Sequence, residues 1–194
     1  FLHEPTIAKK FESLINTKAP WTHKDLATNP EARLDVAESL AVFSAFAEGV
    51  SLYSSFAVLY SFQLRNLLKG VGQQMKWSVR DESLHSRMGC ALFRHMCKEY
   101  PELKDEVKTT VENAAKYMVQ LEVNFIDKMF EMGDLENLKS IDLKNFIYRR
   151  ANEKLRELEY ENIFEVNDES ADQLEWFYHL TGGETWTDFF AIRS

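Results

Sequence analysis

The feature that most constrains this sequence is an apolar stretch at residues 39–64, which reads SLAVFSAFAEGVSLYSSFAVLYSFQL. Its only charged residue is Glu48, near the middle. A helix that is apolar on nearly every side is typical of the centre of a bundle. A membrane span would also need about 20 mostly apolar residues, but six serines, Gln63 and the central carboxylate argue against one. We therefore expect a buried helix, in which Glu48 binds a cation, a metal or hydrogen-bond donors, or is protonated.

Composition favours one all-α domain that extends over residues 1–194. Of 194 residues, 45% are hydrophobic, and only seven are glycine and four proline, which favours long helices over turn-rich β structure. The net charge of −8 without a long basic run argues against nucleic acid as a partner. Cys90 and Cys97 are seven residues apart on a predicted helix, about 10 Å along its axis, which is too far for a disulfide. With no secretory leader visible, we expect a cytoplasmic protein with no membrane anchor.

Helix signals recur along the whole chain. Asn29 can cap a helix that starts at Pro30, and few residues interrupt that helix before Gly70 and Gly72. Pro101 separates the next two helices, and Gly133 is a plausible C-terminal stop. Several helices near thirty residues indicate a bundle. The predicted helices are an opening helix at 5–15, two long helices at 30–69 and 73–100 that carry the candidate site, and helices at 102–132, 140–161 and 172–180.

The candidate site is a short acidic motif, RDESLH, at residues 80–85. Glu82 and His85 are three residues apart, so they share one helix face and can point at one ion. A Glu-x-x-His pair on one helix and a lone inward Glu48 on its neighbour form half of the ligand set of a ferritin-like di-metal site. The chain contains no second Glu-x-x-His. A solvated helix face and a hydrogen-bonded buried acid remain the alternatives for these residues.

These segments resemble the carboxy-terminal half of the radical-generating small subunit of class I ribonucleotide reductase. That resemblance implies that Glu48, Glu82 and His85 bind the second metal, and that Glu82 also bridges to the first. It implies that Asp81 hydrogen-bonds the histidine ligand of the first metal and relays the radical. The matching segments are LHEPTIAKKFE, AEGVSLYSSF, LKGVGQQMKWSVRDESLHSRMG, NFIYRRANEKL and TDFFAIRS.

The resemblance also implies a cofactor and partners. The cofactor would be a dinuclear centre, Fe/Fe first, with Mn/Fe or Mn/Mn as alternatives, because hard oxygen ligands suit these metals. It would generate an oxidising radical that the large subunit uses to make deoxyribonucleotides, and the small subunit would be a dimer. In the family, the other ligands and the radical tyrosine lie before the position of Phe1. We therefore expect an amino-terminal half on the same or a separate polypeptide.

Two other interpretations remain open. The chain could be a structural or assembly fragment of such a subunit, or another ferritin-like di-metal oxidase with the same half-site. The adjacent Arg80 and Asp81 favour the reductase. Leu52 and Phe56, one and two turns after Glu48, could form an apolar wall near the metal or pack in the core.

Overall fold

The structure is a computed structural model that describes residue 5 and residues 21–181, so the predicted opening helix lies almost wholly outside the described residues. Within them there is no strand, only an isolated bridge between Leu135 and Leu138, and the all-α prediction is confirmed. The elements are α2 His23–Thr28, α3 Pro30–Val42, the π-helix η1 Phe43–Ala47, α4 Tyr53–Leu64, α5 Lys69–Glu99, α6 Leu103–Met129, α7 Ser140–Glu157, α8 Asp168–Asp172 and α9 Glu175–Thr181.

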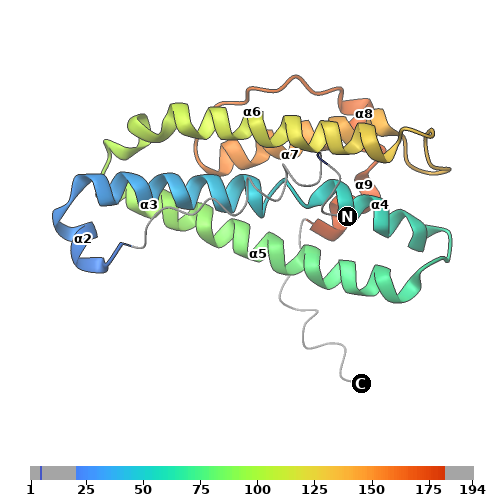
Figure 1. Cartoon of the computed structure of the whole chain (residues 1–194), viewed down its shortest axis with the longest axis horizontal. Helices are drawn as coiled ribbons and strands as arrows, with labels where there is room; N and C mark the ends of the chain where they lie inside the picture. Colours follow the sequence, from blue (N-terminus) through green and yellow to red (C-terminus); the bar gives the residue numbers. More distant parts are fainter. Residues whose placement is uncertain (1–4, 6–20, 182–194) are drawn as a thin grey trace.

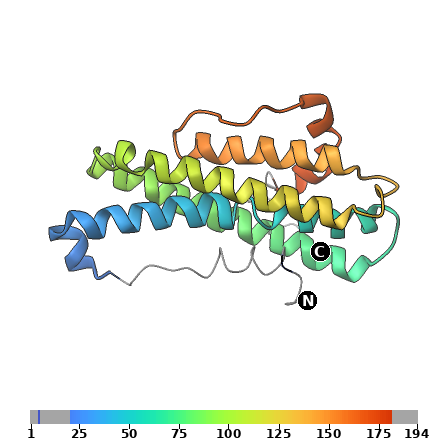
Figure 2. The same cartoon turned by 45° about the horizontal axis from the view of Figure 1, so that its top comes forward.

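The long helices pack side by side as a bundle. In Figure 1, α3, η1 and α4 follow one another along the long axis, and α5 returns beside them. α3 packs on both α5 and α6, α4 packs on α5, and α6 packs on α7. Figure 2 shows the same rods after a turn of 45°, with α7 and α6 stacked over α3 and α5. The ligand-bearing parts of the sequence are therefore neighbours in the bundle.

The predicted first long helix begins where expected but is not continuous. The Asn29 side chain accepts a hydrogen bond from the Glu31 N–H at 3.0 Å, and Pro30 is the first helical residue. The expected helix 30–69 is divided into α3, η1 and α4, with turns at 48–52. The helix-breaking role expected of Gly70 and Gly72 was wrong, because both lie inside α5. The break comes earlier, at a turn with Asn66 and Leu68 at positive φ (59° and 49°).

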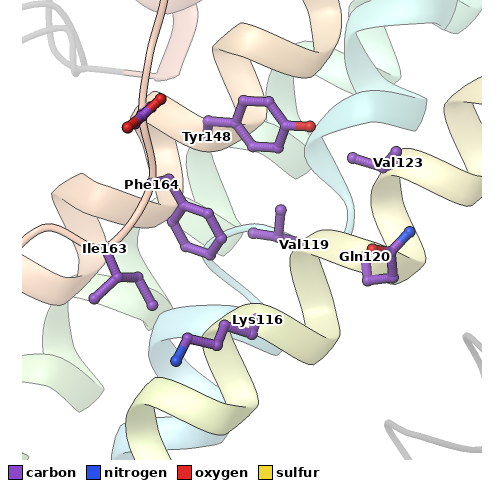
Figure 3. A pocket seen from close by; sticks show the side chains of 8 residues that line it. Lys116, Val119, Gln120, Val123, Tyr148, Ile163 and Phe164 are labelled. Atoms are coloured by element: carbon purple, nitrogen blue, oxygen red, sulfur yellow. The ribbon is translucent and has the colours of Figure 1, made fainter.

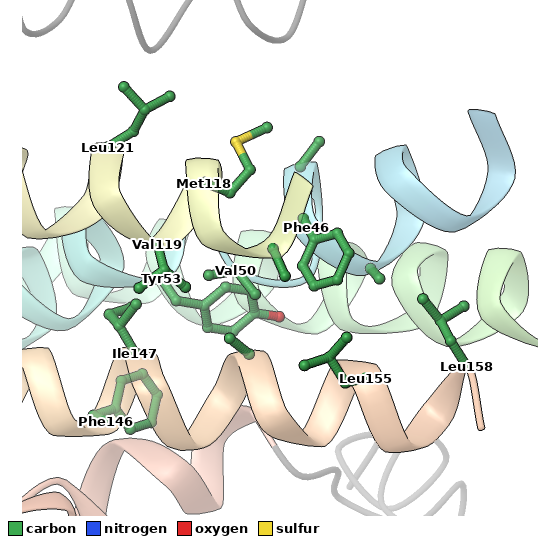
Figure 4. Packing of buried hydrophobic residues seen from close by; sticks show 14 of the residues in the cluster. Phe46, Val50, Tyr53, Met118, Val119, Leu121, Phe146, Ile147, Leu155 and Leu158 are labelled. Atoms are coloured by element: carbon green, nitrogen blue, oxygen red, sulfur yellow. The ribbon is translucent and has the colours of Figure 1, made fainter. Parts of the chain in front are cut away.

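The core lies between the long helices, and residues of α3, η1 and α4 contribute to it. Figure 4 shows Phe46 of η1, Val50 of the turn that follows and Tyr53 of α4 packed among side chains of α6 and α7. Phe46 and Tyr53 are completely buried. Burial of a large apolar side chain contributes about 1.5–3 kcal/mol. The apolar stretch at 39–64 is thus the centre of the bundle, as its composition indicates.

Glycines allow η1 and α5 to approach closely. A Cβ atom on Gly89 of α5 would overlap the Ser44 side chain of η1. One on Gly49 would overlap the Ala45 carbonyl oxygen and lie 2.7 Å from Ser86 Oγ of α5. Because neither glycine has a side chain, the backbone around Glu48 lies directly against the helix that carries Glu82.

The helices and the two cysteines bear on the expectations about a membrane span and a disulfide. No helix in residues 21–181 has both the length and the apolar character that a bilayer crossing needs. Cys90 and Cys97 are both free thiols, as their spacing predicted. Burial raises the pKa of Cys90 to about 12, so its thiol stays protonated and packs as a small apolar group.

Candidate metal centre

The structure brings three predicted ligands together. One carboxylate oxygen of Glu48, one of Glu82 and a ring nitrogen of His85 lie within 4.8 Å of one another. His85 Nδ1 is 3.9 Å from Glu48 Oε1 and 3.9 Å from Glu82 Oε2. Ligand atoms bound to one ion at about 2.1 Å lie about 3–4 Å apart, so small side-chain rotations would close these three atoms around a cation.

Local backbone structure positions each ligand. Glu82 and His85 occupy consecutive turns of one face of α5, as expected for i and i+3. Glu48 follows the π-helix, and its N–H donates to the Phe43 carbonyl at 3.0 Å, five residues back. Such π-bulges occur frequently at functional sites. The extra residue in the turn displaces Glu48 from the position that a regular helix would give it.

The carboxylates of Glu48 and Glu82 lie in an environment that disfavours their charge. Burial raises the pKa of Glu48, and the neighbouring Glu82 and then Asp81 carboxylates raise it further, against a lowering by His85. Burial likewise raises the pKa of Glu82, assisted by Asp81 and opposed by His85. A cation between the two carboxylates would relieve both effects. The electrostatics therefore fit a metal-binding role.

Asp81 lies beside the imidazole of the same half-site. Its Oδ1 is 3.7 Å from His85 Nε2, on the side of the ring away from Glu48 and Glu82, and its side chain is 68% exposed. The i and i+4 positions on α5 explain this proximity. No histidine of a first metal lies in the described group, so the predicted contact of Asp81 with such a ligand stays a prediction.

The ligand-bearing face of α5 is open and apolar. The His85 side chain is 49% exposed, and large apolar residues on the same stripe are also exposed. Exposed apolar side chains that gather beside polar residues often mark a surface that contacts a partner. We call this surface the α5 face; its residues are Trp77, Asp81, Leu84, His85, Met88 and Leu92.

Leu52 and Phe56 lie next to Glu48 in sequence but not on a regular helical face. Leu52 caps α4 and is half-buried, packing against the core. Phe56 is buried and meets the Tyr53 ring edge-on, with centroids 5.8 Å apart. The turns at 48–52 remove the regular spacing on which the predicted apolar wall rested. The proposed role of Leu52 and Phe56 as an apolar wall near the metal stays a prediction.

A separate open pocket of about 360 Å³ lies between α6, α7 and the segment that follows α7. Figure 3 shows Lys116, Val119 and Val123 of α6 facing Tyr148 and Phe164. The Tyr148 and Phe164 rings are stacked, with centroids 6.0 Å apart. None of the predicted site residues lines this pocket, and it contributes nothing to the metal centre.

Sequence reasoning missed a buried polar contact behind the ligands. Arg150 of α7 is 4% exposed and donates from Nε to the Gly49 carbonyl at 2.5 Å. Its guanidinium carbon lies 3.5 Å from the Tyr53 ring centroid. Its place on the same helical stripe as Ile147 and Leu143 indicates burial, but its partner, the Gly49 carbonyl, follows from the fold.

Comparison with known proteins identifies the family. The family described as "Ribonucleotide reductase, small chain" matches residues 4–171. The chain belongs to this family. Two viral members are probable ribonucleoside-diphosphate reductase small subunits. The chain is 34% identical over 158 residues to the one from Invertebrate iridescent virus 3, covering 80% of this chain and 41% of the relative. It is 32% identical over 186 residues to the one from Invertebrate iridescent virus 6, covering 84% and 52%.

A solved structure shows the same fold. A putative class I ribonucleotide reductase from Bacillus halodurans matches with a TM-score of 0.74 at 23% identity, covering 92% of this chain and 60% of that chain. The chain thus spans about half the length of the curated relatives it matches. The small-chain family implies a dinuclear metal site. The donor set of Glu48, Glu82 and His85 fits one side of such a centre.

Proposed function

We propose that this chain is part of the small subunit of a ribonucleoside-diphosphate reductase. In this proposal, Glu48, Glu82 and His85 hold one metal of a dinuclear centre, and Glu82 also bridges to the other. The observation that carries the proposal is the convergence of these three ligand atoms within 4.8 Å in a chain that belongs to the small-chain family.

The bound metals would supply the one-electron oxidising equivalent that the large subunit uses to reduce ribonucleotides. The chain's own residues would bind and shape the centre. His85 would bind through Nδ1, which faces both carboxylates, and Asp81 would hydrogen-bond a histidine of the first metal and relay the radical. Such carboxylate contacts fix the orientation and tautomer of an imidazole ligand. Leu52 and Phe56 would form an apolar wall that limits water.

The remaining ligands would come from residues outside 21–181, on the same polypeptide or on a separate one. Two metal ions in a ferritin-like site need about twice the donors that this chain brings together. The exposed α5 face supports this, because apolar side chains around a metal ligand would be covered in a working centre. A split subunit, a dimer of small subunits and docking on the large subunit are parts of the proposal.

The metal and the compartment are proposed on chemical grounds. Two carboxylates and an imidazole suit iron and manganese alike, with Fe/Fe first and Mn/Fe or Mn/Mn as alternatives. The free thiols of Cys90 and Cys97 suit a reducing, cytoplasmic setting.

Reductase activity of the native small-subunit complex with its large subunit tests the proposal. Glu82→Ala should abolish deoxyribonucleotide formation, because it removes the bridging ligand. Glu99→Ala, an exposed acid on the same helix, should retain it. Full activity of a correctly folded Glu82→Ala complex would refute the assignment.

Asp81→Asn separates a radical relay from a solvated surface acid. If Asp81 orients a histidine ligand, the variant should fold, retain most of its metal and still fail in turnover with the large subunit. Metal content and activity are measured on the same preparation. Normal activity at normal metal content would remove Asp81 from the proposed path.

A further inference from the structure

The backbone carbonyl of Gly49, directly after the ligand Glu48, lacks its usual helical donor. In a regular α-helix the Tyr53 N–H would donate to it. Here the Tyr53 N–H donates to the Val50 carbonyl at 3.1 Å. The donor to Gly49 is instead the Arg150 side chain, through Nε at 2.5 Å. A side chain of α7 thus replaces the missing backbone bond beside a metal ligand.

Arg150 also contacts the second ligand-bearing segment, through Tyr53. Its guanidinium lies over the Tyr53 ring, 3.5 Å from the centroid. The Tyr53 hydroxyl and Ser83 Oγ are 2.7 Å apart and hydrogen-bonded. Ser83 lies between Glu82 and His85 in sequence. One arginine is therefore linked to the residue after Glu48 and, through a phenol, to the residue after Glu82.

The position of Arg150 is costly for a purely structural residue. It is 4% exposed, and within residues 21–181 no carboxylate lies within 4.0 Å of its guanidinium. Burying an unpaired charge destabilises a fold, and an apolar side chain of similar volume is often neutral or stabilising at such a position. The carbonyl and the aromatic ring offset only part of this cost. A role at the adjacent site would explain why an arginine occupies this position.

We propose that Arg150 is a positioning residue of the metal centre, which sets the separation of Glu48 and Glu82 through Gly49 and through Tyr53 and Ser83. The inference rests on the proposed function. Metal ligands need support that holds them within about 0.5 Å of a productive geometry. The backbone bonds of the irregular turn after η1 hold the N–H groups of Glu48, Val50 and Ser51 but leave the Gly49 carbonyl without its helical donor. Arg150 supplies it from the opposite side of the bundle.

Titration of the chain with Mn²⁺, followed by the EPR signal of the free ion, tests the proposal. Arg150→Met should weaken Mn²⁺ binding by about 10- to 100-fold, the usual effect of losing a residue that supports a ligand. Arg150→Lys should recover part of the loss. Arg149→Met is the matched control, because Arg149 is the neighbouring arginine on α7 and pairs with Asp168 and Asp172 at the surface; it should bind as the wild type does.

Stability separates positioning from folding. The melting temperature of Arg150→Met should equal or exceed that of the wild type, because the substitution removes a buried charge. Its Mn²⁺ affinity should nevertheless fall. Tyr53→Phe provides an independent variant if Arg150→Met does not fold, because it keeps the ring beneath Arg150 and removes only the bond to Ser83. It should weaken Mn²⁺ binding several-fold.

The outcomes distinguish this inference from the proposed function. If folded Arg150→Met binds Mn²⁺ as tightly as the wild type, and Glu82→Ala abolishes binding, the positioning role alone is overturned. If Arg150→Met does not fold, the same result in Tyr53→Phe overturns it. Wild-type binding that is absent, or that survives Glu82→Ala, overturns both the proposed function and this inference.

Discussion

Within residues 21–181, no lysine or arginine forms an ion pair with Glu48 or Glu82; their basic neighbour within 4.0 Å is the His85 ring. Burial is the largest cause of their raised pKa values; Asp81 raises both further, and the Glu82 carboxylate also raises the pKa of Glu48. Groups with a raised folded-state pKa stabilise the fold below their unfolded pKa, and that contribution is lost as the pH rises through the folded value. At neutral pH the metal-free site therefore destabilises the chain.

Glu48→Gln should reveal this cost. In the metal-free chain, the melting temperature of Glu48→Gln minus that of the wild type should increase as the pH rises. The increase should begin at about pH 4, near the unfolded carboxyl pKa, and continue through the raised folded pKa of Glu48. Added Mn²⁺ should stabilise the wild type and not the variant. Thermal melts at several pH values measure both effects.

The control is Glu99→Gln, which removes an exposed acid at the end of the same helix. Its melting temperature should follow the wild type at every pH. A Glu48→Gln difference that is constant across this pH range would contradict the account.

At the scale of the elements, sequence patterns predicted the helices well and their interruptions poorly. Asn29 and Pro30 marked a helix start correctly, because capping is a local interaction. The break after α4 was missed, because it is made by Asn66 and Leu68 at positive φ and not by the glycines that follow. Positive φ is uncommon for a non-glycine residue such as leucine, so a search for Gly and Pro breakers does not find this turn.

The candidate site shows the same division between local and tertiary information. Glu82 and His85 were predictable from their spacing, and Glu48 from its isolation in an apolar stretch. Arg150 was not singled out, because its significance depends on a carbonyl about one hundred residues earlier in the chain, freed by the irregular turn after η1. Long-range contacts of this kind follow from the fold and not from the sequence pattern.

The close approach of η1 and α5 makes a direct prediction for Gly89. Gly89→Ala should lower the free energy of unfolding by about 1–3 kcal/mol, the usual cost of overpacking, because its Cβ would overlap the Ser44 side chain. Urea denaturation measures the change. Combining it with Ser44→Gly, which removes the overlapping atoms, should restore part of the loss.

Gly70→Ala is the matched control on the same helix, because nothing lies within 4 Å of a Cβ placed there. It should leave stability unchanged or raise it by up to about 1 kcal/mol, through helix propensity. Equal effects of the two alanine substitutions would show that η1 and α5 are not in close contact at Gly89.

At the scale of the whole molecule, residues 21–181 have a closed core on one side and the exposed α5 face, beside the candidate metal ligands, on the other. Exposed Trp77, Met88 and Leu92 (61%, 57% and 52%) flank the half-exposed His85. A covering segment with further ligands would bury this apolar surface and exclude water from the ligands. The amino-terminal half that we propose, on the same or a separate polypeptide, would supply both the covering segment and the further ligands.

Met88→Glu should therefore have different effects in the chain and in the native small subunit. In the chain alone, the free energy of unfolding should change by less than about 0.5 kcal/mol, as for other exposed sites. In the native subunit, the variant should lose stability and metal, because the charge would be buried. Denaturation and metal analysis of both forms measure this.

Tyr117→Glu is the control for the surface prediction, since Tyr117 is 53% exposed on α6, outside the α5 face. It should leave both forms unchanged. The surface would not be a covered interface if Met88→Glu had no effect on the native subunit.

The measurement that tests the central claim most directly is the metal content of the purified chain after loading with Fe²⁺ or Mn²⁺ and removal of excess metal. The account predicts one ion per chain, bound by Glu48, Glu82 and His85, absent from Glu82→Ala and His85→Ala, and retained in Glu99→Ala to the wild-type level. Two tightly held ions per chain, or metal binding that survives Glu82→Ala, would contradict the account.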